Sequence, residues 1–168
     1  IWQARGKAPK LVLLAAHYDK YRYYSELAGE IYRRYTDLVE PFGIDESWLD
    51  VTGTIHLFGG DPKVLADRLR EDMKRELGLT ISVGVSFNKV FAKLGSDYKK
   101  PDGVTVITRE NYRTLVWPLP ASDLLFVGRA SAEVLAKHRI RTIGDLAAAD
   151  REELLRLLGK AGRQLQDY

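Results

Sequence analysis

Two adjacent carboxylates, Asp45 and Glu46, lie between two apolar segments whose residues favour β-structure. Charged side chains beside buried strands are costly unless a cation or a hydrogen-bonding partner compensates their charge. Carboxylate oxygens are the ligands that a hard divalent ion such as Mg²⁺ prefers. The pair therefore predicts half of a metal site that handles phosphates, although an acidic hairpin turn explains the same two residues equally well.

Whether the two acids can bind metal ions together depends on where they lie in the predicted hairpin. Neighbouring side chains of a regular strand point to opposite faces, so Asp45 and Glu46 can share metal ions only at an irregular strand end. Gly43, just upstream, could supply that irregularity. Asp50 is a third acid on the same strand face as Glu46, and its role stays open.

A predicted helix over residues 88–99 carries a basic stripe on one side and apolar residues on the other. The stripe consists of Lys89, Lys93, Ser96 and Lys100. Lysines in such a row can hold phosphates as mobile point charges, but a solvated helix face has the same appearance. Next to an acidic hairpin, the stripe favours a site for a nucleotide and a metal ion.

The C-terminal part of the chain contains glycines between short helical segments. Gly128 is followed by Arg129, and residues 157–163 form a second candidate hairpin around Gly162. Such a hairpin can present free backbone N–H groups at a helix N-terminus to a DNA phosphate. The alternative is an ordinary capping glycine in a helical bundle, and for Gly162 the two interpretations stay open.

The elements that must position these residues follow from hydrophobic periodicity. Strands are predicted over residues 11–14, 39–44, 47–52, 80–87 and 104–107. Helices are predicted over residues 18–37, 62–77 and 88–99, and short helices follow from residue 108 onward. This order indicates an α+β domain over residues 1–107 and a small all-helical domain over residues 108–168.

The composition narrows the class of protein. Of the 168 residues, 45% are hydrophobic and 29% are charged, with a net charge of +3. This basic balance permits nucleic acid as a partner without requiring it. The absence of cysteine excludes disulfides and cysteine-based zinc sites, and it agrees with a cytoplasmic location. We expect no membrane contact. Because the sequence starts at Ile1, inside a predicted domain, we expect it to be a piece of a longer protein.

Four motifs together are similar to those of one known family. They are residues 43–52 (GIDESWLDVT), 82–94 (SVGVSFNKVFAKL), 96–103 (SDYKKPDG) and 142–146 (TIGDL). In this order the chain resembles the Y-family translesion DNA polymerases, of the bacterial DNA polymerase IV type. The resemblance implies an incomplete palm over residues 1–107, with a ferredoxin-like sheet and helices on one face. It also implies a small all-α helix-hairpin-helix thumb over residues 108–168.

The resemblance also implies roles for single residues. Asp45 and Glu46 would be catalytic and would bind two Mg²⁺ ions, with Glu46 helping the primer 3′-hydroxyl to attack. Lys100 would contact the triphosphate of the incoming nucleotide. The backbone at Gly128 and Arg129 would grip a primer-strand phosphate. The implied partners are primer-template DNA and deoxynucleoside triphosphates, with a sliding clamp bound only through a region beyond this sequence, and the protein is expected to be a monomer.

The chain departs from the family pattern in two respects. The first palm strand, which carries a further metal-binding Asp in the family, and the fingers that follow it have no counterpart in this sequence, so we expect the chain alone to be inactive. In the thumb, Phe126 and Arg139 stand where the family usually has glycine. Because residues other than glycine disfavour positive φ, we expect a less tight hairpin and a phosphate contact that is weaker or differently shaped.

Two other functions remain as alternatives. The first is a nucleotide cyclase-like palm domain, against which the thumb-like hairpin argues. The second is a non-catalytic DNA-binding protein with a degenerate palm, against which the combination of Asp45, Glu46 and Lys100 argues.

Overall fold

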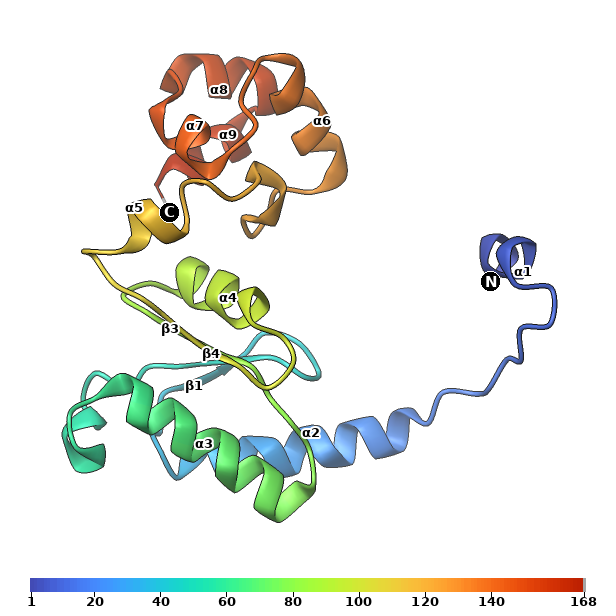
Figure 1. Ribbon diagram of the computed structural model, residues 1–168, viewed down its shortest axis with the longest axis vertical. Coiled ribbons are helices and arrows are strands. Elements are labelled where there is room, and N and C mark those ends of the chain that lie inside the picture. The colour runs from blue at the N-terminus through green and yellow to red at the C-terminus, as the bar shows by residue number, and fades with distance from the viewer. Residues whose placement is uncertain (168) are drawn as a thin grey trace.

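The computed structural model describes residues 1–167, in which helices surround four short strands and a helical region lies at one end (Figure 1). The strands are β1 (Val39–Pro41), β2 (Ser47–Leu49), β3 (Val83–Ser86) and β4 (Val104–Ile107). The helices of the first part are α1 (Trp2–Lys7), α2 (Tyr18–Arg33), α3 (Pro62–Leu77) and α4 (Lys89–Tyr98), with a 3₁₀ turn over Ile55–Phe58. The later helices are α5 (Tyr112–Leu115), α6 (Arg129–Lys137), α7 (Ile143–Ala148), α8 (Arg151–Leu158) and α9 (Lys160–Gln166), with a 3₁₀ turn over Ala121–Asp123.

The strands form two separate pairs. β1 and β2 are antiparallel, with Val39 opposite Leu49 and Pro41 opposite Ser47. β3 and β4 are parallel, as expected for strands joined through a crossover helix, which here is α4. The predicted α+β class is confirmed, but the single sheet is wrong for residues 1–167, because no described strand joins the two pairs by hydrogen bonds.

Local sequence signals set the ends of α3. The Asp61 side chain caps the helix by accepting a hydrogen bond from the Lys63 backbone N–H at 2.8 Å, and Pro62 occupies the first turn. Gly78 ends the helix in the left-handed conformation, with φ of 66°. The buried face of α3 comprises Leu65, Ala66, Leu69 and Met73, and it packs with Ile31 and Tyr35 on α2 and the adjoining turn.

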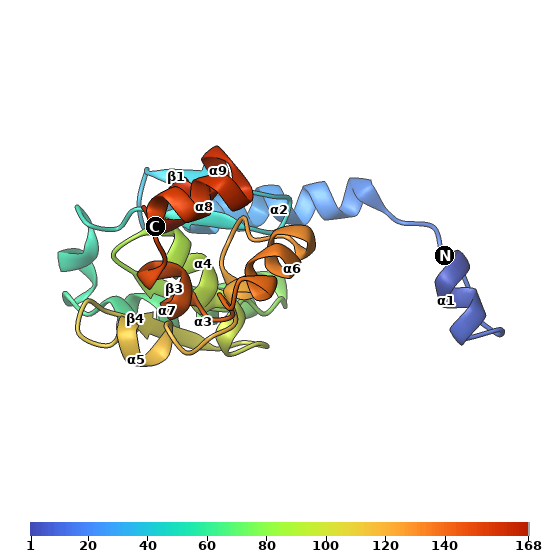
Figure 2. The ribbon, with the colours of Figure 1, turned by 90° about the horizontal axis from the view of Figure 1, so that it is seen from above.

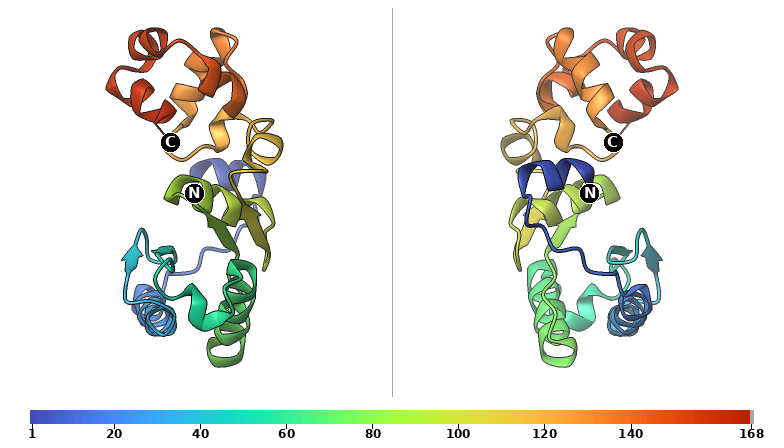
Figure 3. Two further views of the ribbon diagram at one scale, coloured as in Figure 1. Left: turned by 90° about the vertical axis from the view of Figure 1, so that its left-hand side faces the viewer. Right: turned by 90° about the vertical axis from the view of Figure 1, so that its right-hand side faces the viewer.

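Helix α4 packs directly on β3 and β4. The Asn88 side chain caps it by accepting a hydrogen bond from the Phe91 N–H at 2.8 Å. A Cβ atom on Gly84 would lie 1.8 Å from the carbonyl oxygen of Ala92, so only glycine allows this close approach of strand and helix. Figures 1 and 3 place α4 on one side of β3 and β4 and α3 on the other, whereas we predicted helices on one face. Helix α4 is the crossover between the parallel strands β3 and β4, whereas α3 joins β2 to β3, so nothing in this connection requires both helices to lie on one face.

The core of the helical region is continuous with that of α4 and β4. Its buried residues include Phe91, Ile107, Val116, Leu135 and Leu154. Helix α7 begins with a capping box, in which Thr142 and Asp145 each accept a hydrogen bond from the other's backbone N–H. The predicted helices after residue 108 are confirmed. The domain division between residues 107 and 108 stays a prediction.

The N-terminal segment differs from its prediction. Residues 11–14 form no strand, and Val12 and Leu14 are 77% and 89% exposed. The apolar run predicted a buried strand, but a strand needs a partner edge, and Figure 2 shows this segment leading away from the rest of the chain to α1. Helix α2 also ends earlier than predicted, at Arg33. None of the helices within residues 1–167 is long and apolar enough to cross a membrane.

Candidate functional site

Asp45 and Glu46 occupy the loop of the β1–β2 hairpin, where the strand geometry is irregular as predicted. The backbone N–H groups of Phe42 and Gly43 both donate to the carbonyl oxygen of Glu46, at 2.9 and 3.2 Å, which closes the loop. Asp45 is exposed and Glu46 is half-buried. The negative charge of Asp45 adds to the effect of burial in raising the pKa of the nearby Tyr32 hydroxyl.

The hairpin is fastened to the start of α4 through Trp48. The indole Nε1–H of Trp48 donates to the carbonyl oxygen of Lys89 at 3.0 Å, and the Lys89 ammonium lies 5.4 Å from the centre of the indole ring. Lys89 also forms an ion pair with Glu40 on β1. These contacts fix the position of the two loop carboxylates relative to the lysines of α4.

Lys93 joins the acidic loop to the end of α4. Its Nζ lies 3.0 Å from Glu46 Oε1 and 2.6 Å from Asp97 Oδ2, and its side chain is only 18% exposed. Burial disfavours the charge of Lys93, but hydrogen bonds with Asp97 and Glu46 outweigh burial and raise its pKa. Lys100 Nζ lies 2.7 Å from Asp97 Oδ1. We name this continuous series, Glu46–Lys93–Asp97–Lys100, the charged chain.

The charged chain changes the interpretation of the predicted basic stripe. Lys89, Lys93 and Lys100 each have a carboxylate partner, so the stripe is an arrangement of ion pairs and not a free row of cations. Lys100 lies beyond the last helical residue, Tyr98, on the loop that leads to β4. The sequence pattern placed these lysines near the acids but did not reveal the pairing, since Glu46 is far from Lys93 in the sequence.

The chemistry of the two loop carboxylates fits a divalent metal in part. Asp45 and Glu46 offer hard oxygen donors side by side, and at least Asp45 is open to solvent. Within residues 1–167, no group of three or more His, Cys, Asp or Glu side chains is placed to hold one ion. The two acids therefore supply a portion of a coordination sphere, and further ligands must come from substrate, water or other protein groups.

Gly128 and Arg129 start α6 and are exposed. Gly128 has φ of −74°, and nothing lies within 4 Å of the position of its absent Cβ, so a ligand can approach the N-terminus of α6 closely. The Arg129 side chain is 93% exposed and pairs with Glu133 at 2.9 Å. The predicted role of the two residues in binding a phosphate is compatible with this exposure and stays a prediction.

The turn geometry around α6 persists without the usual glycines. Phe126, before the helix, has φ of 72°, and Arg139, after it, has φ of 64°. The less tight hairpin that we predicted from Phe126 and Arg139 is absent: both residues adopt the left-handed conformation that glycine would adopt more easily. In contrast, Gly162 is buried, and a Cβ there would lie 2.1 Å from the carbonyl oxygen of Leu154, which indicates a packing role.

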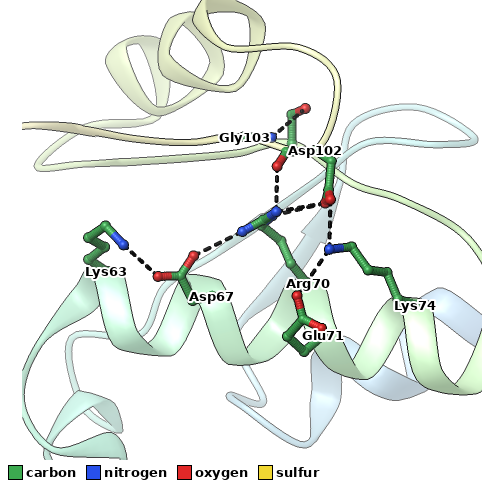
Figure 4. A network of polar contacts seen from close by, with 8 residues as sticks. Lys63, Asp67, Arg70, Glu71, Lys74, Asp102 and Gly103 are labelled. Carbon is green, nitrogen blue, oxygen red and sulfur yellow. Dashed lines mark hydrogen bonds and ion pairs between the residues drawn. The ribbon is translucent and has the colours of Figure 1, made fainter.

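A second cluster of ion pairs has no clear signal in the sequence. It joins α3 to the loop over residues 99–103 and centres on Arg70, Lys74 and Asp102 (Figure 4). The only sequence signal was the presence of Asp102 in the KKPDG run that carries Lys100. Arg70 and Lys74 lie on α3 at a spacing that is also typical of a solvated helix face.

Comparison with known proteins agrees with this arrangement. A model of the impB/mucB/samB family matches residues 1–97. The chain is 50% identical over 168 residues to the DNA polymerase IV of Acetivibrio thermocellus, covering all of this chain and 42% of that protein. It is 40% identical over 167 residues to DNA polymerase IV 1 of Bacillus subtilis, covering 99% of this chain and 40% of that protein. The chain thus spans less than half the length of these curated relatives.

The fold is also shared with a solved structure. The crystal structure of a DinB family error-prone DNA polymerase from Sulfolobus solfataricus is similar with a TM-score of 0.88 and 26% identity. The similarity covers 99% of this chain and 50% of that one, so it includes both the strand-containing part and the helical part.

Proposed function

The chain belongs to the impB/mucB/samB family of Y-family proteins, and on this premise we propose that it is the palm and thumb of a translesion DNA polymerase. The proposed reaction is template-directed and error-prone addition of deoxynucleotides by two-metal phosphoryl transfer. The observation that carries the proposal is the charged chain, in which Glu46, Lys93, Asp97 and Lys100 follow one another in contact. It connects a candidate metal ligand to a candidate phosphate ligand.

Each site residue has a distinct part in the proposed reaction. Asp45 and Glu46 would hold Mg²⁺, which when bound supplies charge neutralisation at the phosphates and activation of the primer 3′-hydroxyl. Glu46 is proposed to orient that hydroxyl, and Lys93 keeps the Glu46 carboxylate in a fixed position. Lys100, which is exposed, is proposed to bind the triphosphate as a mobile cation. Catalysis then rests mainly on positioning and electrostatics.

The helical region is proposed to hold the primer-template duplex. The backbone N–H groups of the exposed residues Gly128 and Arg129 would bind a primer-strand phosphate, because the N-terminus of a helix attracts anions. The net charge of +3 favours a polyanionic partner. We further propose that the polymerase is a cytoplasmic monomer, and that any contact with a sliding clamp lies outside residues 1–168.

The test is primer extension by the full-length protein with Mg²⁺ and deoxynucleotides. Asp45→Ala and Glu46→Ala should each abolish extension while primer-template binding stays near the wild-type level. Asp50→Ala is the matched control, because it removes a carboxylate at the end of the same hairpin, where Asp50 accepts a hydrogen bond from the Thr52 N–H and lies outside the loop that holds Asp45 and Glu46. Extension that survives both Asp45→Ala and Glu46→Ala would refute the site assignment.

The same experiment addresses the activity of this chain and the alternative functions. We expect residues 1–168 alone not to extend a primer, because two carboxylates give an incomplete metal site. Robust extension by the chain would contradict that expectation. A cyclic product formed from nucleoside triphosphates without DNA would identify a cyclase instead.

A further inference from the structure

The loop over residues 99–103 connects α4 to β4 and carries Lys100. Its backbone is tightly bent: Asp102 has φ of 57°, and a Cβ on Gly103 would lie 2.0 Å from the carbonyl oxygen of Lys99. Residues other than glycine are uncommon in this conformation, and they persist where surrounding contacts hold them. The contacts that hold Asp102 come from α3.

The Arg70 guanidinium binds both the side chain and the backbone of Asp102. The guanidinium Nε donates to Asp102 Oδ1 at 3.0 Å and Nη2 lies 2.9 Å from the same oxygen, while Nη2 also donates to the Asp102 carbonyl. Figure 4 shows this guanidinium between the loop and the helix. Because one rigid fork engages a carboxylate and the carbonyl of the same residue, it fixes the backbone as well as the side chain.

Two further ion pairs complete the attachment. Lys74 Nζ lies 2.6 Å from Asp102 Oδ2, so both carboxylate oxygens are occupied by cations of α3. Asp67 Oδ1 in turn lies 2.9 Å from Arg70 Nη1 and orients the guanidinium. The Arg70 side chain is only 14% exposed, so these interactions are less screened than surface ion pairs.

The attachment is separable from the packing of α3. The helix is held in the core by Leu65, Ala66, Leu69 and Met73, none of which depends on Asp102. Loss of the Arg70 contacts therefore leaves α3 in place and releases mainly the loop. In a released loop Lys100, which lies two residues before Asp102, would occupy a wider range of positions.

We propose that Arg70, assisted by Lys74, is a positioning residue that holds the 99–103 loop so that Lys100 meets the triphosphate of the incoming nucleotide. The proposal rests on the proposed function, since it takes Lys100 as the phosphate ligand. Arg70 acts through Lys100 and does not itself touch substrate. Its contribution is to nucleotide affinity and not to the metal-dependent chemistry at Asp45 and Glu46.

The test is single-nucleotide insertion by the full-length protein, with a double-mutant cycle between Arg70→Gln and Lys100→Ala. Each single change should weaken the apparent affinity for the deoxynucleotide by about tenfold while the maximal rate changes by less than about threefold. The double variant should be no weaker than Lys100→Ala alone, because the loop matters only through Lys100. Arg70→Lys should recover part of the affinity.

A control variant and a second loop variant separate an effect on loop position from an effect on stability. Lys63→Met removes a cation that pairs with Asp67 on the same helix but does not contact the loop, and it should leave the affinity unchanged. Lys74→Met provides a second release of the loop if Arg70→Gln fails to fold. In either loop variant, hydrogen exchange at the Gly103 amide should speed up while exchange within α3 stays slow.

The outcomes distinguish this inference from the proposed function. If Lys100→Ala leaves nucleotide affinity unchanged, the proposed role of Lys100 is wrong. If Lys100→Ala weakens affinity but the Arg70 and Lys74 variants do not, or if their effects add to that of Lys100→Ala, Arg70 is not a positioning residue for Lys100.

Discussion

The end of α6 contains an arginine where the backbone calls for glycine. The Arg139 N–H donates to the carbonyl of Ala136 at 3.1 Å, and the Ile140 N–H donates to the carbonyl of Leu135 at 3.0 Å. These are the two hydrogen bonds of a Schellman motif, which requires a left-handed residue after the cap. Arg139 occupies that position with φ of 64°. We predict that Arg139→Gly stabilises the chain.

The magnitude follows from two opposing backbone terms. A left-handed conformation costs a residue with a Cβ about 1–2 kcal/mol. Glycine avoids that cost but loses more conformational entropy on folding, by about 0.5–1 kcal/mol. The Arg139 side chain is exposed, so its removal loses little packing. The net gain is about 0.5–1 kcal/mol, which for a chain of this size corresponds to roughly 1–4 °C in Tm.

The assay is thermal and urea unfolding of matched variants. Arg139→Ala removes the same side chain but keeps a Cβ at positive φ, so its stability should stay within about 0.5 kcal/mol of wild type. Arg141→Gly makes the same substitution two residues later, outside the left-handed region, and should destabilise by about 0.5–1 kcal/mol. The reasoning is refuted if Arg139→Gly is no more stable than Arg139→Ala, or if it loses as much stability as Arg141→Gly.

Three further predictions concern packing and pH. In urea unfolding, Gly84→Ala should lower the free energy of unfolding by about 3 kcal/mol or more, because the new Cβ would overlap backbone atoms of α4. Gly53→Ala is the control: its Cβ would have no atom within 4 Å, so the free energy of unfolding should stay within about 0.5 kcal/mol of wild type. Equal effects of the two changes would contradict the close approach of β3 and α4. Leu154→Ala, at a fully buried site, should cost about 2–5 kcal/mol in the same assay, and a cost below about 1 kcal/mol would show that this core is loosely packed. The hydrogen bond from the Tyr35 hydroxyl lowers the pKa of Asp72, so the stability gained from this carboxylate is full above its unfolded pKa of about 4 and is lost as pH falls below it. The stability difference between wild type and Asp72→Asn, measured by thermal unfolding, should therefore shrink below pH 4, and a difference that is constant down to pH 2 would contradict the assignment.

Signals between residues close in the sequence determined most of the secondary structure. Asp61 and Gly78 mark the two ends of α3, and Asn88 marks the start of α4, because caps act on backbone groups within one turn. The acidic pair lies in an irregular hairpin loop as predicted, and this signal was also local, since Gly43 stands two residues before Asp45. The strand predicted from the apolar run at residues 11–14 was wrong, because a strand must pair with the edge of another strand, and the residues of the run do not provide one.

Only the tertiary structure decided how the charged residues combine. Lys93 reads as one lysine of a solvated stripe until the fold brings Glu46 to 3.0 Å from its ammonium. Arg70 carries no signal of its own until α3 meets the 99–103 loop and the guanidinium reaches Asp102. The sequence by itself determined which residues could perform chemistry on phosphates, because side-chain type and short-range periodicity are local properties. The partners of those residues depend on chain segments far apart in the sequence, and long-range packing alone brings these together.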